Sequence, residues 1–347
     1  MNRRHRRHAI KLLLAVSTSL ALQLSCALPS VAAAPSKLVI GYAAVTARIM
    51  PLWIAQDQGF FVKYGIDSEP VLIRGGTTLV TGLASGDVQI GRTAGAAVLS
   101  AVAAGHDLKM VATFSSRNSY NVVVRPNIKK AEDIRGKKIA INSFGGGTWV
   151  GAMLWLEHFG LEPQRDQILL QSVGDQSVQA QALDTGVVDV AFVDSFYANW
   201  LKQRGMTVLA EYTELKQPLV SQSTVVQRGF LQQRPDAVEN YLKAEIEGMA
   251  FGVGPKNKPA TIKLLMRRLR TDAAGAEDGY LDLLRGIDRK PFASLDGMRN
   301  LQRLLKGRTP KIDELKVEDV VDNRMMRKLE ESGFIDRAYA AQGAGIK

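Results

Sequence analysis

The sequence predicts an α/β fold made of two similar α/β lobes with a cleft between them. Two observations lead to this fold class. Short apolar runs alternate with segments of 10 to 20 residues that have helical spacing, as in layers of parallel strands and helices. The runs of the first half also reappear in the second half at an offset of about 100 residues.

Eight apolar runs are predicted to be strands. Each is short and nearly continuous in apolar residues, which is typical of strands buried on both faces. In chain order they are KLVIGY, EPVLIR, DVQIG and LKMVATF, followed by KKIAIN, QILLQSV, VDVAFVD and MTVLAEY.

The repeat is clearest at the glycines that precede matching runs. LASGDVQI and LDTGVVDV align Gly86 with Gly186, and Gly105 and Gly205 precede HDLKMV and MTVLA in the same way. In each copy a predicted helix ends at a glycine and the chain continues into a buried strand. Generic strand and helix units can resemble one another by chance, but this register persists across four strands and favours two similar lobes.

The first 34 residues are predicted to be a signal peptide. MNRRHRRHAIK is a basic n-region, LLLAVSTSLALQLSCAL is an apolar h-region, and PSVAAAPS offers small residues for cleavage. Ser, Thr and Gln interrupt the apolar stretch, which disfavours a retained membrane anchor. RRHAIK also loosely fits a twin-arginine signal, so Sec and Tat export both stay open.

Composition excludes several classes of function for the mature chain. The one cysteine, Cys26, lies in the leader, so disulfides and thiolate sites are not expected. The leader also holds five of the 45 basic residues, which leaves 40 against 34 acidic ones, or +6 instead of +11. Without a basic stripe interleaved with aromatic residues, no nucleic acid partner is expected. His106 and His158 stand alone, so no metal site is predicted.

A glycine-rich turn, INSFGGGTWVG at residues 141–151, joins a predicted strand to a predicted helix. Glycines let a backbone approach a ligand closely, and a helix N-terminus offers unpaired N–H groups. RGGTT at 74–78 and GRTAG at 91–95 hold the same position in the first lobe. Because ligands of open α/β sheets bind beyond the carboxyl ends of the strands, these turns predict a site for an anion or a small heterocycle. The spacing fits neither a dinucleotide motif nor a P-loop.

The segment MPLWIAQDQGFFVKYGI, residues 50–66, resembles the first helix of nitrate/sulfonate/taurine-type periplasmic solute-binding proteins of ABC importers. LASGDVQIG, IKKAEDIRGKKIAI and ALDTGVVDVAF resemble further segments of that family, with Gln89 where the family usually has Asp. The resemblance covers about residues 37–225, with less specific similarity in a C-terminal helical region. No single segment is diagnostic, but together, in this order and after a signal peptide, they are strong evidence for the resemblance.

The resemblance implies a type II periplasmic binding protein with two hinge crossings, near NSYNVVVRP and SQSTVVQ. Lobe one would comprise residues 37–120 plus 222–347 with C-terminal helices packed around it, and lobe two residues 121–221. It further implies a monomer in the periplasm that needs no cofactor. Such a protein captures a small solute of the sulfonate, taurine or nitrate type and delivers it to a membrane permease and ATPase.

Candidate ligand-binding residues lie where predicted strands end or helices begin. Arginine suits bidentate recognition of a sulfonate or carboxylate, and an aromatic ring can stack on a ligand. Thr77 either caps a helix or faces the cleft, and Asp194 either caps the helix that starts SFYANW or pairs with a ligand amine. The predicted set is Tyr42, Arg48, Gly76, Thr77, Arg92, Thr93, Ser143, Gly145, Gly146, Gly147, Thr148 and Asp194.

Two other functions stay open at this stage. Some relatives of the fold act in making the thiamine pyrimidine, and a binding protein or enzyme of that type is one alternative. Their site resembles one rich in Cys and His, which the exported, cysteine-free mature chain lacks. A periplasmic sensor or interaction module is the other alternative. No catalytic residues are predicted.

Overall fold

The computed structural model describes residues 36–117, 120–211 and 218–345. The chain from Pro35 onward forms one compact unit, and the predicted signal peptide lies outside the described residues. Within the described part, no helix is both long enough and apolar enough to cross a membrane.

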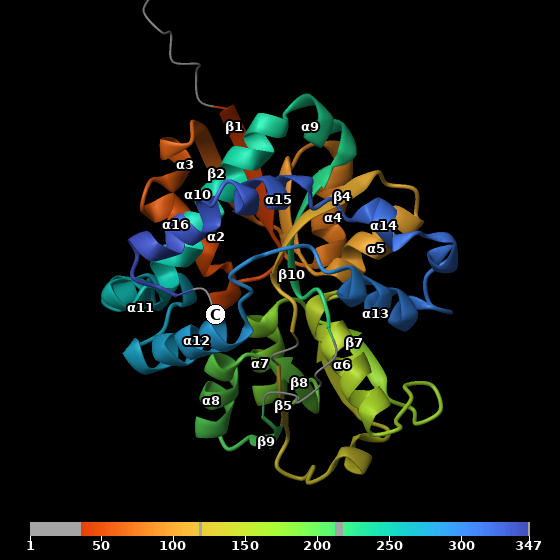
Figure 1. Cartoon of the computed structure of the whole chain (residues 1–347). Helices are drawn as coiled ribbons and strands as arrows, with labels where there is room; N and C mark the ends of the chain where they lie inside the picture. Colours follow the sequence, from red (N-terminus) through yellow and green to blue (C-terminus); the bar gives the residue numbers. More distant parts are fainter. Residues whose placement is uncertain (1–35, 118–119, 212–217, 346–347) are drawn as a thin grey trace, which may run out of the picture. The chain divides into compact units, whose positions relative to one another are not determined.

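The first sheet has five strands in the order β2-β1-β3-β10-β4 and fills the upper half of Figure 1. Strand β1 is parallel to β2 and β3, whereas β10 runs antiparallel to both β3 and β4. The bounds are Ser36–Tyr42 for β1, Ile66–Leu72 for β2, Ile90–Thr93 for β3, Leu108–Ser115 for β4 and Gln222–Gln227 for β10.

The second sheet has the order β7-β6-β8-β5-β9 and lies in the lower half of Figure 1. Strand β6 is parallel to β7 and β8, and β5 runs antiparallel to β8 and β9. The bounds are Asn121–Val124 for β5, Lys138–Ile141 for β6, Leu169–Ser172 for β7, Val190–Val193 for β8 and Thr207–Ala210 for β9.

The two sheets have the same strand order, as the repeat predicts. Strands β1, β2, β3 and β4 correspond to β6, β7, β8 and β9. Each of the eight predicted runs overlaps its strand, and the four runs of lobe two contain theirs completely. The antiparallel strand of each sheet is the first one after a crossing: β5 follows β4, and β10 follows β9. The prediction of two similar α/β lobes is confirmed. We call the first sheet with its helices lobe one and residues 121–210 lobe two; the finer limits inferred from the resemblance stay a prediction.

Helices cover both sheets. Those that follow lobe-one strands are η1 Ala47–Ile49, α2 Met50–Asp57, α3 Phe60–Lys63, α4 Gly76–Ser85 and α5 Gly95–Ala103. Lobe two carries η2 Ala131–Ile134, α6 Gly147–His158, α7 Gln176–Asp184 and α8 Ser195–Gln203. Beyond β10 lie α9 Arg228–Gln233, α10 Pro235–Val253, η3 Pro255–Asn257, α11 Lys258–Leu269, α12 Ala273–Gly286, α13 Leu295–Leu305, η4 Ile312–Glu314, α14 Val317–Val320, α15 Arg324–Glu331 and α16 Phe334–Ala341.

Helix α10 is the main support of lobe one. Pro235 occupies its first turn, and its apolar face, including Tyr241 and Leu242, is fully buried. It packs on α2 so closely that a Cβ on Gly248 would lie 2.3 Å from the backbone oxygen of Pro51. A glycine is therefore required where the two helices meet.

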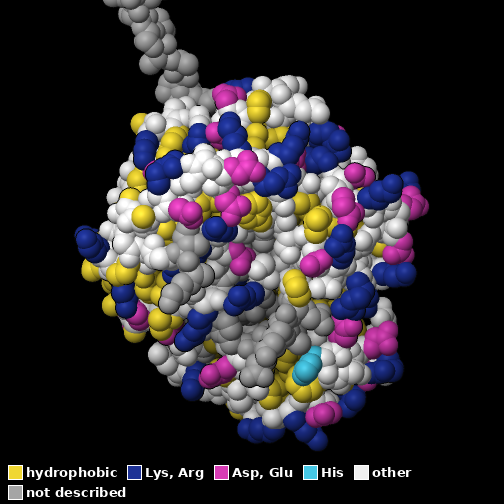
Figure 2. All heavy atoms as spheres, in the orientation of Figure 1, with side chains coloured by type: hydrophobic (Ala, Val, Ile, Leu, Met, Phe, Trp, Pro, Cys, Tyr) yellow, Lys and Arg dark blue, Asp and Glu magenta, His cyan; other side chains and the backbone are white. Residues whose placement is uncertain are grey.

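The resemblance implies that the C-terminal helices pack around lobe one. In the structure they also contact lobe two. Asn199 of α8 donates to Asp278 of α12 at 2.6 Å. Arg303 of α13 forms an exposed ion pair with Glu157 of α6 at 2.6 Å. On the face seen in Figure 2, basic and acidic side chains are interspersed, so the positive charge is spread over this face and not gathered in one band.

Candidate functional site

A small cavity lies between the lobes, at the carboxyl ends of β1, β3 and β6, where the fold class predicts a ligand. Its volume is about 20 Å³, which is room for about one water molecule. Lobe one contributes Ala43, Ala44, Thr46, Arg48, Thr93 and Ala94, the segments at the two crossings contribute Tyr120, Ser221 and Gln222, and lobe two contributes Asn142, Gly147, Thr148, Asp175 and Gln176.

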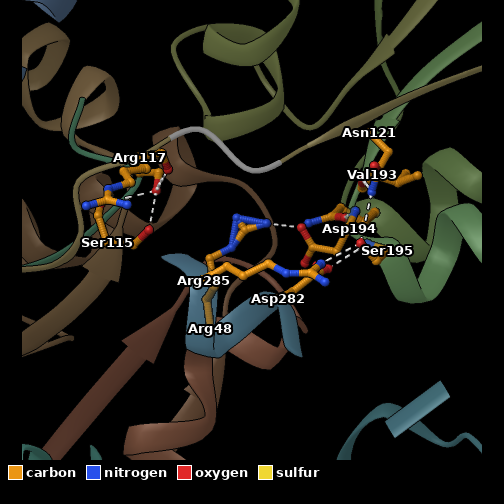
Figure 3. Close-up of polar contacts among 11 residues, drawn as sticks. Arg48, Ser115, Arg117, Asn121, Val193, Asp194, Ser195, Asp282 and Arg285 are labelled. Carbon is orange, nitrogen blue, oxygen red and sulfur yellow. Dashed lines mark hydrogen bonds and ion pairs between the residues drawn. The ribbon is translucent and has the colours of Figure 1, made fainter. Parts of the chain in front are cut away.

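Arg48 and Asp194 form a buried ion pair across the lobes beside this cavity (Figure 3). Arg48 comes from η1 in lobe one, Asp194 follows β8 in lobe two, and their side chains are 6% and 5% exposed. The guanidinium also lies over the ring of Tyr120, 4.7 Å from its centroid. Burying two charges has a desolvation cost that their attraction must offset, so this pair places one positive and one negative group together away from solvent.

Asp194 is free to face Arg48 because another carboxylate caps its helix. Asp194 holds the N-cap position of α8 but makes no capping hydrogen bond, so the capping prediction is wrong. The N–H and hydroxyl of Ser195 instead donate to Asp282 of α12, at 2.6 and 2.7 Å. Burial raises the pKa of Asp282, against the opposing effect of these hydrogen bonds and of the charges of Arg48 and Arg285.

A second ion pair crosses the lobes at Asp175, which also lines the cavity. Asp175 caps α7 by accepting from the backbone of Ser177 and Val178 at 3.1 and 3.3 Å. Its second carboxylate oxygen forms an ion pair with Arg74 of lobe one but no hydrogen bond within the described part. The Asp175 side chain is fully buried, whereas that of Arg74 is 52% exposed.

Besides the Asp175 oxygen that pairs with Arg74, three polar atoms of cavity-lining residues are buried without a hydrogen-bond partner among the described residues. They are Oγ1 of Thr46, Oγ1 of Thr93 and Oε1 of Gln222. An unsatisfied buried group costs about 1–3 kcal/mol, so native proteins usually satisfy such atoms with water or a ligand. The hydroxyls can donate or accept, and the amide oxygen can only accept.

The structure brings five of the twelve predicted residues together at the cavity. Arg48, Thr93, Gly147 and Thr148 line it, and Asp194 contacts Arg48 beside it. The residues that do not line it are Tyr42, Gly76, Thr77, Arg92, Ser143, Gly145 and Gly146.

The residues outside the lining have other contacts. Arg92 is fully buried within lobe one and pairs with Glu245 of α10. Tyr42 packs edge-on against Trp53, with ring centroids 6.2 Å apart. Thr77 is exposed and does not cap α4, whose N-cap is Gly75; its hydroxyl donates to the backbone oxygen of Phe144 at 3.3 Å.

The glycines of the turn at residues 145–147 allow neighbouring side chains to pack closely against its backbone. Gly145 has a φ of 74°, which favours glycine. A Cβ on Gly146 would lie 2.4 Å from the side-chain amide of Asn142, and one on Gly147 would lie 2.6 Å from the hydroxyl of Tyr120. Asn142 in turn accepts from Thr148 at 2.9 Å. The turn thus positions two lining side chains, and its contact with an anion stays a prediction.

Sequence reasoning missed several lining residues, although signals for some were present. The repeat aligns RGG at 74–76 with VGD at 173–175, so the predicted Gly76 has Asp175 as its counterpart. Tyr120 and the pair Ser221 and Gln222 lie in the two segments identified as crossings. Thr46, Asn142 and Gln176 carried no distinguishing pattern. Among the described residues, no group of three or more His, Cys, Asp or Glu side chains could hold a metal ion.

A sequence model of the NMT1/THI5-like family matches residues 46–256, which is 211 of the 347 residues. The chain belongs to the NMT1/THI5-like family. This match covers β2 to β10 and both crossings, so it includes all the cavity-lining residues except Ala43 and Ala44.

This NMT1/THI5-like chain is similar to known binding proteins. It is 30% identical over 204 residues to the taurine-binding periplasmic protein of Escherichia coli K12, and the match covers 57% of this chain and 61% of that protein's length. Its fold matches the alkanesulfonate-binding protein SsuA of Xanthomonas axonopodis pv. citri, solved bound to MOPS, with a TM-score of 0.69 and 20% identity. That match covers 84% of this chain and 100% of the SsuA chain.

The fold is not confined to binding proteins. The desulfurization enzyme DSZB matches with a TM-score of 0.60 and 14% identity, over 86% of this chain and 99% of the enzyme. The function of this NMT1/THI5-like chain therefore depends on the residues of its site and does not follow from its architecture.

Proposed function

We propose that this protein is the periplasmic solute-binding component of an ABC importer. It captures a small solute of the sulfonate type, in the first place an aminosulfonate, and delivers it unchanged to a membrane permease and ATPase. The protein acts as a monomer after removal of its leader. The observation that carries this proposal is the buried pair of Arg48 and Asp194, whose opposite charges come from opposite lobes at one cavity.

This pair suits a solute with an anionic end and a cationic end. A guanidinium binds a sulfonate or carboxylate with parallel hydrogen bonds, and a carboxylate accepts from an ammonium group. Inserting such a solute between Arg48 and Asp194 replaces one buried ion pair by two. The hydroxyls of Thr46 and Thr93 and the amide oxygen of Gln222 can satisfy the remaining polar atoms of the solute.

The cavity volume supports binding coupled to hinge motion. Its 20 Å³ holds about one water molecule and no solute of the sulfonate type. The lobes must therefore separate before a solute enters, which breaks contacts such as those of Asp282 with Ser195. A solute that restores the interlobe attraction then favours closure, as in other two-lobed proteins.

Calorimetry with a matched pair of probes tests the proposal. Taurine has both an amine and a sulfonate, and ethanesulfonate lacks the amine. Asp194→Asn is expected to weaken taurine binding at least tenfold, or about 1.4 kcal/mol, and ethanesulfonate binding much less. Arg48→Gln is expected to weaken both probes at least tenfold.

The control is Arg303→Gln, which removes an exposed interlobe ion pair away from the cavity and should leave both affinities nearly unchanged. Equal losses for taurine and ethanesulfonate in Asp194→Asn would refute the role assigned to its carboxylate. If the folded wild-type protein bound neither probe, nor nitrate or a small carboxylate, the proposed function itself would be rejected.

A further inference from the structure

A second pocket, of about 370 Å³, is lined by residues of α7 and α8 in lobe two together with Leu269 and Arg270 at the C-terminal end of α11 in lobe one. It shares no lining residue with the interlobe cavity. Its volume is within the range of small-molecule sites, about 300 to 1,000 Å³. The lining residues that matter here are Phe196, Tyr197, Trp200, Arg204, Leu269 and Arg270.

Aromatic rings form the wall of this pocket, and two of them are held in place. Phe196 packs so closely on Gly275 of α12 that a Cβ there would lie 2.8 Å from the ring. Phe196 and Tyr197 also pack against each other, with ring centroids 4.6 Å apart. Rings that are already fixed lose little entropy when a flat ligand stacks on them.

The rim of the pocket is positively charged. Arg204 lies 4.4 Å from the centroid of the Trp200 ring and pairs with Asp184 at 3.0 Å. Arg270 is exposed and makes neither a hydrogen bond nor an ion pair through its side chain within the described part. The lining thus includes two guanidinium groups and one carboxylate. Burial raises the pKa of Tyr197 to about 12, so its phenol stays neutral and does not repel an anion.

Arg270 also has an unusual backbone. Its φ of 55° and ψ of 52° place it in the left-handed region, which a residue with a Cβ seldom adopts. This conformation turns the chain sharply at the end of α11, between Leu269 and the start of α12. Strain of this kind is retained where the surrounding structure determines it, and it accumulates at ligand sites.

We propose that this pocket binds a small aromatic anion, meaning a ring system that carries one sulfonate or carboxylate. The ring stacks among Phe196, Tyr197 and Trp200, and the anionic group pairs with Arg270. Because the rings belong to lobe two and Arg270 to lobe one, an occupant touches both lobes and stabilises the arrangement in which they are in contact. The proposal does not depend on the identity of the solute in the interlobe cavity.

Titration calorimetry with naphthalene-1-sulfonate tests it, with naphthalene-1-sulfonamide as the neutral probe of the same shape. The sulfonate is expected to bind with a dissociation constant between about 10 μM and 1 mM, and the sulfonamide at least tenfold more weakly. Trp200→Ala and Arg270→Gly should each weaken the sulfonate at least tenfold. Glycine suits the left-handed backbone, so Arg270→Gly should fold normally.

Lys311→Gly is the matched control, since Lys311 is another exposed cation with a left-handed backbone, at a φ of 59°. It should change affinity less than twofold. Binding that survives both Trp200→Ala and Arg270→Gly would overturn the proposal, as would no binding of the sulfonate at millimolar concentration. Loss of binding in Arg48→Gln, with Trp200→Ala unaffected, would place the ring in the interlobe cavity and also overturn it.

Discussion

The ion pair between Arg92 and Glu245 allows a direct measurement of how much a buried counter-ion contributes to the stability of lobe one. Both side chains are fully buried, and Glu245 also accepts from Thr224 at 3.4 Å. The guanidinium lies 4.3 Å from the centroid of the Phe114 ring. Burial lowers the pKa of Arg92 to about 10, so the group is still charged at neutral pH.

Glu245→Gln keeps the shape of the side chain and removes its charge, which leaves the Arg92 cation buried without a counter-ion. Removing one partner of a buried pair typically costs about 3–5 kcal/mol, and we expect a loss of this size in the free energy of unfolding. Urea unfolding followed by circular dichroism measures it, because urea, unlike guanidinium, does not screen charges. The double variant Arg92→Met, Glu245→Leu should recover most of the loss, since it removes both charges.

Glu247→Gln is the matched control on the same helix. Glu247 pairs with Lys63, whose side chain is 54% exposed, and removing such a pair typically costs about 0.2–1 kcal/mol. If Glu245→Gln cost no more than Glu247→Gln, the argument that the buried carboxylate compensates the charge of Arg92 would be refuted.

Two further predictions concern the interlobe contacts and the glycine turn. Burial raises the pKa of Asp282, so between about pH 3.9 and that raised value the folded state binds more protons than the unfolded state. The free energy of unfolding contributed by this group therefore rises as pH falls through that window, and Asp282→Asn should lack this contribution; identical pH dependence in urea titrations of both proteins would contradict it. Gly146→Ala should displace Asn142, lower the free energy of unfolding by about 1–3 kcal/mol and weaken solute binding. Gly229→Ala, where a Cβ meets open space, should be neutral or slightly stabilising, and equal melting temperatures for the two variants would disprove the packing argument.

The layered architecture could be predicted because it depends on local patterns. Each apolar run overlaps a strand, and the two halves related by the offset share one strand order. The helix over RPDAVENYLKAEIEGMAFG follows from the spacing of its apolar residues and from Pro235 at its start. The contacts of α12 and α13 with lobe two were not predicted, because they depend on exposed polar residues such as Asp278 that have no periodic pattern.

The candidate site was harder to predict. The type of a residue near the end of a strand does not determine which group its side chain will contact. Arg48 and Arg92 have the same chemistry and similar positions, yet Arg48 reaches the cavity and Arg92 turns into the core toward Glu245. For Asp194 the sequence left two roles open, capping of α8 and pairing with a ligand amine, and the structure gives the capping contact to the distant Asp282. The partners of these side chains lie far away in the sequence. A single sequence therefore does not reveal which groups will pair.

The position of β10 imposes an order on the folding of the growing chain. All five strands of lobe two lie between residues 121 and 210, so that sheet is complete once this segment is available. In lobe one, β10 pairs with both β3 and β4, although more than 100 residues separate Ser223 from its partner Thr113. Until residues 222–227 arrive, β3 and β4 each present an unpaired edge. Strand pairings over such a sequence separation form slowly. Lobe two, in the middle of the chain, is therefore expected to become native first, and lobe one, which contains the first strands, is expected to become native last.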